Sequence, residues 1–171
     1  MAEEPVPVQS LKEDGITVAL TYKTLNARAI MDEVRSPKAG AIVLFAGTTR
    51  DNFDSKPVLH LAYDSSPPLA LQTMLNIARS MKSKHSLTAI SIIHRLGVVS
   101  IGEESILIAV SAPHRQAAWK GGEDALEDVK EKVEIWKLEE FGGEEGGVWR
   151  ANRDGAVGEK VMDGYNGKNT G

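Results

Sequence analysis

The sequence predicts a single α+β domain in which a mostly antiparallel sheet is packed with helices. Segments with helical periodicity are mixed along the chain with short strand-like segments, and hairpin-like connections join several of these strands. The chain has 171 residues. That length suits one domain, because a chain of about this size buries roughly 70% of its unfolded surface.

The compact part of the domain is expected at residues 15–153. Residues 1–14 carry prolines and acidic side chains without a long periodic pattern, so we expect a flexible lead-in there. Residues 154–171 are rich in Gly, Asn and Lys, and we expect them to form a flexible tail.

Three strands and two helices are expected in the first half of the domain. The strands are short alternating or apolar runs at 16–21, 41–45 and 58–63. One helix is expected at 25–34, and Pro67 and Pro68 open the other, because proline is tolerated in the first helical turn. The buried stripe of this second helix is expected to consist of Leu71, Met74, Leu75, Ala78 and Met81.

The second half is expected to contain two strands, a long helix and a final short strand. The strands lie at 89–96 and 105–110, and residues 99–103 between them are typical of a hairpin connection. Apolar or small residues spaced by three and four positions predict the helix at 116–132. A last strand is expected around 147–150.

Composition excludes several classes of function. The net charge of −4 argues against a general nucleic-acid binder, so any attraction for anions must come from a local group of cations. The absence of cysteine excludes a disulfide framework, a thiolate metal site and a cysteine nucleophile. No apolar stretch approaches the roughly 18 residues that cross a bilayer. With no signal or transit pattern at the N-terminus, we expect a cytosolic protein.

The first candidate site is the end of the predicted strand before Gly47, Thr48, Thr49 and Arg50. Glycine allows a ligand to approach the backbone closely, and hydroxyls with an arginine suit phosphate or carboxylate oxygens. An ordinary polar turn is the alternative interpretation.

The second candidate is His114 with Arg115, at the start of the predicted long helix. The helix dipole disfavours cations at this end, and a bound anion would relieve that conflict. A capping segment with solvated side chains explains the same pattern.

The third candidate is the pair Lys130 and Lys137, which are seven residues apart. A continuous helix would place them on one face about two turns apart. A lysine held near other cations can serve as a base or an amine nucleophile. Acidic neighbours surround Lys130 in the sequence, namely Glu127, Asp128, Glu131 and Glu134. A solvated face of paired charges is therefore the competing interpretation.

Other motifs are absent. The sequence has no Walker A motif, dinucleotide fingerprint or nucleophile elbow, and no cofactor is expected. The glycine-rich run at 142–147 is acidic and is expected to be a flexible loop. The four histidines are scattered without metal-ligand spacing, so no metal is expected, and His94 is expected to be structural.

Three segments taken together resemble one family. They are 40–50, which ends in Gly-Thr-Thr-Arg, then Ile-His-Arg-Leu-Gly at 93–97, and Ala-Pro-His-Arg at 112–115 followed by Lys130 and Ile-Trp-Lys-Leu-Glu at 135–139. Their order and spacing resemble the large catalytic subunit of molybdopterin synthase over about residues 15–153. The resemblance implies an α/β-hammerhead-like fold and a sulfurtransferase of molybdenum cofactor biosynthesis.

The same resemblance implies the substrate and the partners. The family converts cyclic pyranopterin monophosphate to molybdopterin by installing two sulfurs as a dithiolene. Each sulfur arrives as a thiocarboxylate on the C-terminal Gly-Gly of a small ubiquitin-like subunit, whose tail enters the large subunit. The family forms a heterotetramer around a homodimer of large subunits, without nucleic acid or membrane.

Site residues are carried over by position in these motifs. Lys130 and Lys137 match the catalytic lysines, which also contact substrate. The resemblance implies substrate binding by further residues, namely Thr48, Thr49, Arg50, His114, Arg115, Leu138, Glu139 and Arg153. Arg153 is matched only through its position after Trp149, beyond the glycine-rich run.

Two departures from the family pattern concern this site. Glu134 replaces a frequent proline, so the helix is free to extend further, and Leu138 replaces a frequent basic residue. The sequence is also compatible with two other functions, namely a non-catalytic module that binds a ubiquitin-like tail or a phosphate, and a metal-free phosphate-ester enzyme that needs no partner.

Overall fold

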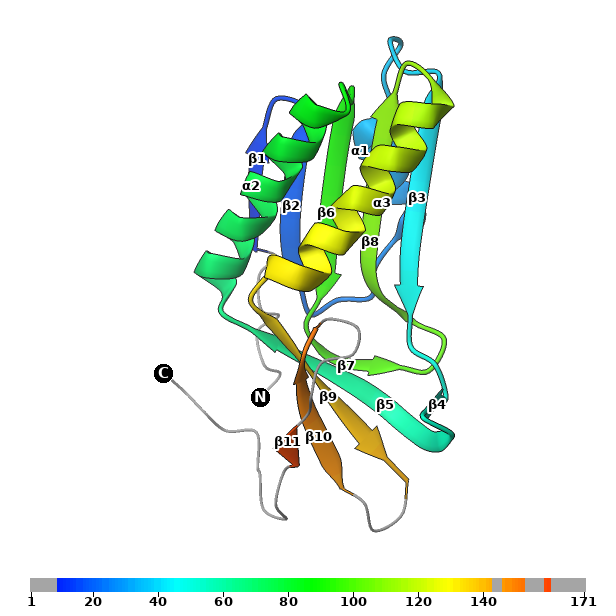
Figure 1. The fold of residues 1–171 in the computed structure, drawn as a ribbon, viewed down its shortest axis with the longest axis vertical. Coiled ribbons are helices and arrows are strands. Elements are labelled where there is room, and N and C mark those ends of the chain that lie inside the picture. Colours follow the sequence, from blue (N-terminus) through cyan, green and yellow to red (C-terminus); the bar gives the residue numbers. More distant parts are fainter. Residues whose placement is uncertain (1–8, 143–145, 153–158, 161–171) are drawn as a thin grey trace, which may run out of the picture.

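The computed structural model describes residues 9–142, 146–152 and 159–160. Within these residues the chain forms two sheets and three helices, and the second sheet lies beyond one end of the first (Figure 1). The predicted α+β class is confirmed. Nearly all strand pairs are antiparallel, and β2 with β6 is the parallel pair among the described strands.

The first sheet has the strand order β1-β2-β6-β8-β3. Its strands are β1 (Gln9–Glu13), β2 (Ile16–Thr21), β6 (Ala89–Arg95), β8 (Glu104–Ala112) and β3 (Ala41–Thr48). β8 is buried along almost its whole length, because helices cover both faces of the sheet beside it.

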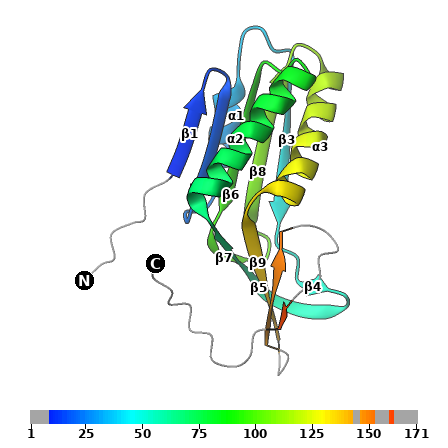
Figure 2. The same ribbon diagram turned by 60° about the vertical axis from the view of Figure 1, so that its left-hand side comes forward.

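The helices are divided between the two faces of this sheet. α2 (Pro67–Lys84) and α3 (Arg115–Lys132) cover one face, and the short α1 (Ala27–Val34) covers the other (Figures 1 and 2). The predicted stripe of α2 is confirmed, since Leu71, Met74, Leu75, Ala78 and Met81 are all buried in the main core. None of the described helices is long and apolar enough to cross a membrane.

The second sheet has the strand order β11-β10-β9-β5-β4, and β7 also pairs with β5. Its strands are β11 (Glu159–Lys160), β10 (Gly147–Ala151), β9 (Ile135–Phe141), β5 (Lys56–Ser65), β4 (Asn52–Phe53) and β7 (Gly97–Ser100). β5 follows β3 through β4, and β9 follows α3 directly, so both elements connect the layers.

Parts of both ends that were predicted to be flexible form short strands. Residues 9–13 form β1, which pairs with β2 from Gln9 opposite Leu20 to Glu13 opposite Ile16. Glu159 and Lys160 in the predicted tail pair with β10. Backbone pairing to a neighbouring strand forms these elements, and it leaves no side-chain periodicity in so short a segment.

Two connections were also predicted incorrectly. Residues 97–100, half of them assigned to a hairpin connection, form β7 and pair with β5 in the other sheet. Residues 135–141 form β9, a strand that the pattern of their side chains does not predict. At Val133 the backbone turns from helical to extended, with φ −74° and ψ 136°.

A strained two-residue turn joins β4 to β5 and places Phe53. Asp54 and Ser55 both have positive φ, at 47° and 63°, as hairpin turns of this length require. We expect Ser55→Gly to stabilise the fold by about 1 kcal/mol, because glycine has no Cβ to strain in this region. The melting temperature should rise by about 2–4 °C, measured by circular dichroism. Ser10→Gly in exposed, extended β1 is the control and should not raise it.

Candidate functional site

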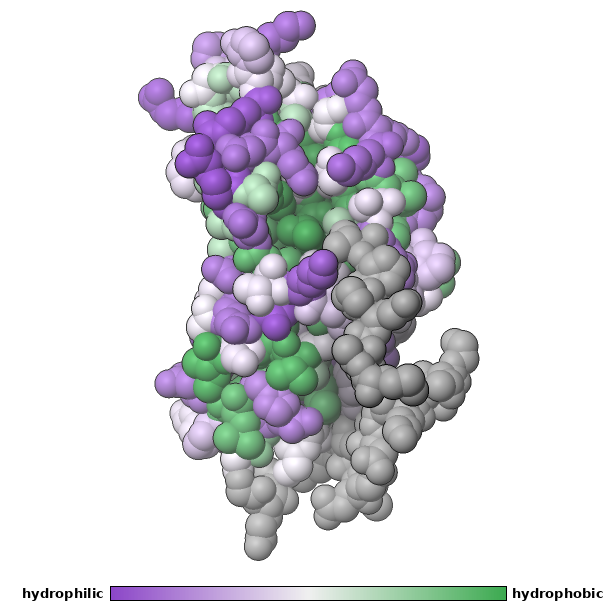
Figure 3. Space-filling model, turned by 180° about the vertical axis from the view of Figure 1, so that it is seen from behind, coloured by the Kyte–Doolittle hydropathy of each residue, from purple (hydrophilic) through white to green (hydrophobic). Residues whose placement is uncertain are grey.

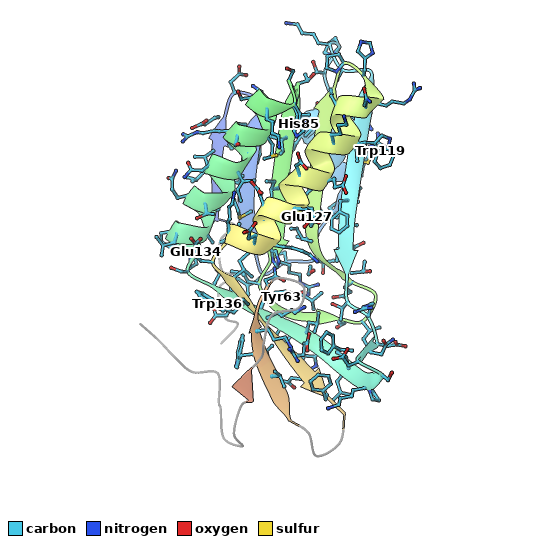
Figure 4. The ribbon with its side chains drawn as sticks, in the orientation of Figure 1. Tyr63, His85, Trp119, Glu127, Glu134 and Trp136 are labelled. Atoms are coloured by element: carbon cyan, nitrogen blue, oxygen red, sulfur yellow. The ribbon has the colours of Figure 1, made fainter. Side chains whose placement is uncertain are left out.

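A pocket of about 390 Å³ lies where the two sheets meet. β3, β8 and the end of α3 line it from the first layer, and β4, β5, β9 and β10 line it from the second. Figure 4 shows Tyr63 of β5 at this junction. The charged side chains that line the pocket are Arg50, Lys130, Lys137, Glu139 and Arg150. Four cations face one carboxylate, an excess of three positive charges, so the pocket suits an anionic ligand.

Lys130 reaches this pocket from the last turn of α3, where the helix dipole favours a cation. It is half-buried. Two of its acidic neighbours in the sequence have other partners: Asp128 accepts from Lys132 at 3.1 Å, and Glu134 accepts from Thr73. Lys130 is therefore not on a fully solvated face, because it lines the pocket and is half-buried.

Lys137 lies on β9, so the hypothesis of one continuous helix is corrected. α3 ends at Lys132, and strand alternation then directs Lys137 and Glu139 toward the pocket. Leu138 is buried between them on the opposite face, beside Gly147. The two lysines line the same pocket from different elements, and Leu138 does not line it.

Glu134 does not prolong the helix as the sequence allowed. The hydroxyl of Thr73 on α2 donates to its carboxylate, 2.9 Å from each oxygen. Figure 4 shows Glu134 at the lower end of α3, next to α2. This contact ties the α3–β9 junction to α2, and the junction separates Lys130 from Lys137.

Glu139 is a carboxylate with 2% exposure between two cations. Its Oε2 accepts from Nε of Arg150 at 3.0 Å, and its Oε1 lies 3.5 Å from Nζ of Lys137. The guanidinium of Arg150 also lies over the ring of Phe53, 4.7 Å from its centroid. A buried carboxylate needs such partners to offset its lost hydration, so Glu139 is paired with two of the four cations that line the pocket.

His94 contributes an uncharged imidazole to the lining of the pocket. Its Nδ1 donates to the carbonyl of Arg95 at 2.7 Å, so its Nε2 is left to accept from the amide of Asn152 at 3.1 Å. Burial lowers the pKa of His94 to about 4, against an opposing effect of the Arg95 hydrogen bond. His94 is buried in β6, as expected for a structural histidine, although it also lines the pocket.

Tyr63 packs edge-on against His94, with ring centroids 4.9 Å apart. Burial raises the pKa of its phenol, the nearby carboxylate of Glu139 raises it further, and a hydrogen bond with Ser105 opposes both. The phenol is therefore protonated at neutral pH and serves as a hydrogen-bonding group.

Only some of the site residues predicted at the end of β3 line the pocket. Thr48 and Arg50 line it, whereas Thr49 is buried beneath the turn before β8. Alternation along an extended chain explains the difference. Gly47 has a packing role, because an added Cβ would lie 2.7 Å from Cγ2 of Ile106 on β8.

His114 and Arg115 are not brought to the pocket. They lie at the first turn of α3, and Lys130 lies in its last turn. Fifteen residues of helix separate Arg115 from Lys130 by about 22 Å. The five cationic residues singled out in the sequence therefore do not form one cluster within one chain. Arg153 lies outside the described residues.

Several pocket residues were not predicted, namely Phe53, Tyr63, Arg150 and Asn152. For Arg150 the sequence offered one signal. It lies in a predicted strand, and because side chains alternate along a strand it must point to one of the two faces of the sheet. Among the residues that the structure describes, no group of three or more His, Cys, Asp or Glu is placed to hold a metal ion.

Comparisons with known proteins agree on one family. The family model described as MoaE protein matches residues 20–132. A molybdopterin synthase catalytic subunit from Sclerotinia sclerotiorum is 69% identical over 153 residues, covering 90% of this chain and 78% of that protein. The crystal structure of molybdopterin synthase from Staphylococcus aureus has a TM-score of 0.73 and 31% identity, covering 77% of this chain and 94% of that one.

A structure of subunits 1 and 2 of the molybdopterin-converting factor from Helicobacter pylori, a protein–protein complex, contains a chain of similar fold. Its TM-score is 0.62 at 24% identity, covering 73% of this chain and 85% of that one.

Proposed function

The chain belongs to the MoaE protein family, and we propose that, as the catalytic subunit of molybdopterin synthase in molybdenum cofactor biosynthesis, it is a sulfurtransferase. It transfers two sulfurs to cyclic pyranopterin monophosphate and forms the dithiolene of molybdopterin. The observation that carries this chemistry is the pocket between the sheets, where four cations face one carboxylate.

Both reactants are anionic, which suits this charge. The substrate carries a cyclic phosphate, and the sulfur donor is a thiocarboxylate. Each transfer passes through a charged intermediate, which preplaced cations stabilise. Lys130 assists attack at the thiocarboxylate carbonyl or protonates the intermediate. Lys137 and Arg50, with Thr48, hold the phosphate and the incoming tail.

His114 and Arg115 keep their predicted role in substrate binding only if a second copy of the chain supplies them. Within one chain the length of α3 separates them from Lys130. The homodimer implied by the resemblance provides such a copy. Thr49, Leu138 and Arg153 also stay predictions, to be tested by substitution.

The proposed partners are a small ubiquitin-like subunit ending in Gly-Gly and a second large subunit, in a cytosolic heterotetramer. The complex solved for the Helicobacter pylori relative supports a partner subunit. Apolar surface supports assembly: Leu59 and Val98 of the second sheet are each more than half exposed. Seen from behind, apolar side chains gather over the lower part of the molecule (Figure 3).

The proposal is tested by reconstitution. The purified chain is mixed with the thiocarboxylated small subunit and cyclic pyranopterin monophosphate, and the dithiolene product is quantified after oxidation to its fluorescent form. We expect product that depends on all three components. A stable complex without sulfur transfer would instead indicate a binding module, and turnover of a phosphate ester without the small subunit would indicate the phosphate-ester enzyme.

A further inference from the structure

Arg150 has contacts that the proposed chemistry does not use. It lies on β10 directly opposite Lys137 on β9. Its Nε donates to Oε2 of Glu139 at 3.0 Å, and its guanidinium lies over the ring of Phe53. Its side chain is only 18% exposed. Arg150 is therefore held from two sides, by a carboxylate and by an aromatic ring.

The two cations beside Glu139 are bound unequally. Nε of Arg150 lies within hydrogen-bond distance of one oxygen, whereas Nζ of Lys137 lies 3.5 Å from the other. A contact of 3.5 Å exceeds the usual range for a charged N–H···O hydrogen bond. Arg150 is thus the closer partner of Glu139, and Lys137 is held more loosely.

We propose that Arg150 is a positioning residue that occupies Glu139 and so keeps Lys137 available to the anionic substrate. Of the two cations beside Glu139, only Lys137 would remain if Arg150 were removed, and the carboxylate of Glu139 would still be buried. Burial makes such a carboxylate a strong attractor of the nearest cation. Lys137 would then be drawn into the ion pair and away from the pocket.

The surroundings of Arg150 support this role. Phe53 stabilises the guanidinium through its ring face, and the β4–β5 turn fixes Phe53. The pairing of β9 with β10 sets Arg150 beside both Lys137 and Glu139, which share one face of β9. An arginine suits the position better than a lysine, because its planar fork can bond a carboxylate and stack on a ring at once.

The test is a double-substitution experiment, and its activity part rests on the proposed function. In Arg150→Met we expect KM for cyclic pyranopterin monophosphate to rise about tenfold or more, equivalent to at least about 1.4 kcal/mol of lost binding. The reason is that Glu139 captures Lys137. Adding Glu139→Gln removes the capturing charge, so the double variant should recover most of the lost affinity.

A second readout does not need turnover. The rate at which acetic anhydride modifies Lys137 is followed by peptide mass spectrometry in all three proteins. We expect slower modification in Arg150→Met and recovery in the double variant. Arg95→Met is the matched control, because Arg95 also pairs with a glutamate, is 13% exposed and does not line the pocket. It should change neither KM nor the modification of Lys137.

The outcomes separate the possibilities. A double variant as impaired as Arg150→Met, with Lys137 modified at the wild-type rate in both, overturns the positioning role and indicates direct substrate binding by Arg150. Circular dichroism melts identify a variant that fails to fold, and Arg150→Lys then replaces it and should show a smaller loss of the same kind. Wild-type protein that makes no product refutes the proposed function, while the modification rates still decide the role of Arg150.

Discussion

Replacing Lys130 with alanine is expected to lower dithiolene formation by a factor of about 10²–10⁴, the usual contribution of a positioned acid or of a charge that stabilises an intermediate. Lys130 lines the pocket from the last turn of α3, half-buried beside Lys137 and Arg50. Removing it deletes one of the pocket cations without cutting into the apolar core. The fold should therefore persist while product formation is lost.

The chain offers a matched control two residues away. Lys132 lies in the same helical turn, is half exposed and pairs with Asp128 at 3.1 Å. Lys132→Ala removes the same charge and atoms from the same helix and should leave product formation near the wild-type level.

Product formation is measured in the reconstituted system with saturating thiocarboxylated partner. Lys130→Arg, which keeps the charge but transfers protons poorly, separates the two roles of this residue. If Lys130→Ala forms nearly as much product as the wild type, and Lys132→Ala is equally active, then Lys130 is not a catalytic residue.

The second large effect concerns the stability of the fold at mildly acidic pH. His94 is fully buried, and its pKa falls from 6.5 to about 4 because burial disfavours the charged ring. This difference corresponds to about 3 kcal/mol of unfolding free energy. The hydrogen bonds agree, because Nδ1 donates to Arg95 and Nε2 accepts from Asn152, so no site is prepared for a second proton.

The direction follows from proton uptake. Above about pH 6.5 the ring is neutral in both states, so the full stability is present. As the pH falls below that value the unfolded chain binds a proton at this residue and the folded chain does not, so stability declines until about pH 4. The pKa values of Glu13, Asp32, Glu103 and Asp124 are lowered by hydrogen bonds from cationic neighbours. Their stabilising contribution is lost at lower pH, below about 4.5.

Urea unfolding between about pH 7 and 5 isolates the contribution of His94. Over this range the free energy of unfolding should fall by up to about 1.4 kcal/mol for each unit by which the pH is lowered. His94→Gln should lower stability at neutral pH but flatten this slope. His114→Gln, at an exposed position, should keep the wild-type slope. A wild-type profile that stays flat over this range, or an unchanged slope in His94→Gln, contradicts the buried neutral histidine.

Much of the first layer was predictable from the sequence, because its elements are amphipathic and their periodicity is local. The stripe of α2, the buried strands β2, β6 and β8, and the half-buried strand β3 are examples. The second sheet was harder to predict, since β9 and β7 pair with β5 across long separations in the chain and carry no distinctive alternation.

The candidate site shows the same division. Motif order in the sequence identified Arg50, Lys130 and Lys137, and all three line the pocket. The sequence also assigned His114 and Arg115 to the same site, because the order of motifs along a chain does not give the distances between their side chains in the folded protein. The axial rise of α3 separates these two residues from the pocket.

The sequence by itself determined the family, the packing of helices on a sheet, and three of the cations that line the pocket, because side-chain chemistry and hydrophobic periodicity are local properties of the sequence. Only the tertiary structure decided which cations share the pocket, and that Glu139 pairs with Arg150 and lies near Lys137. Strand pairing between β9 and β10 and the end of α3 at Lys132 set those distances. Such long-range hydrogen bonding leaves no trace in the spacing of the residues it brings together.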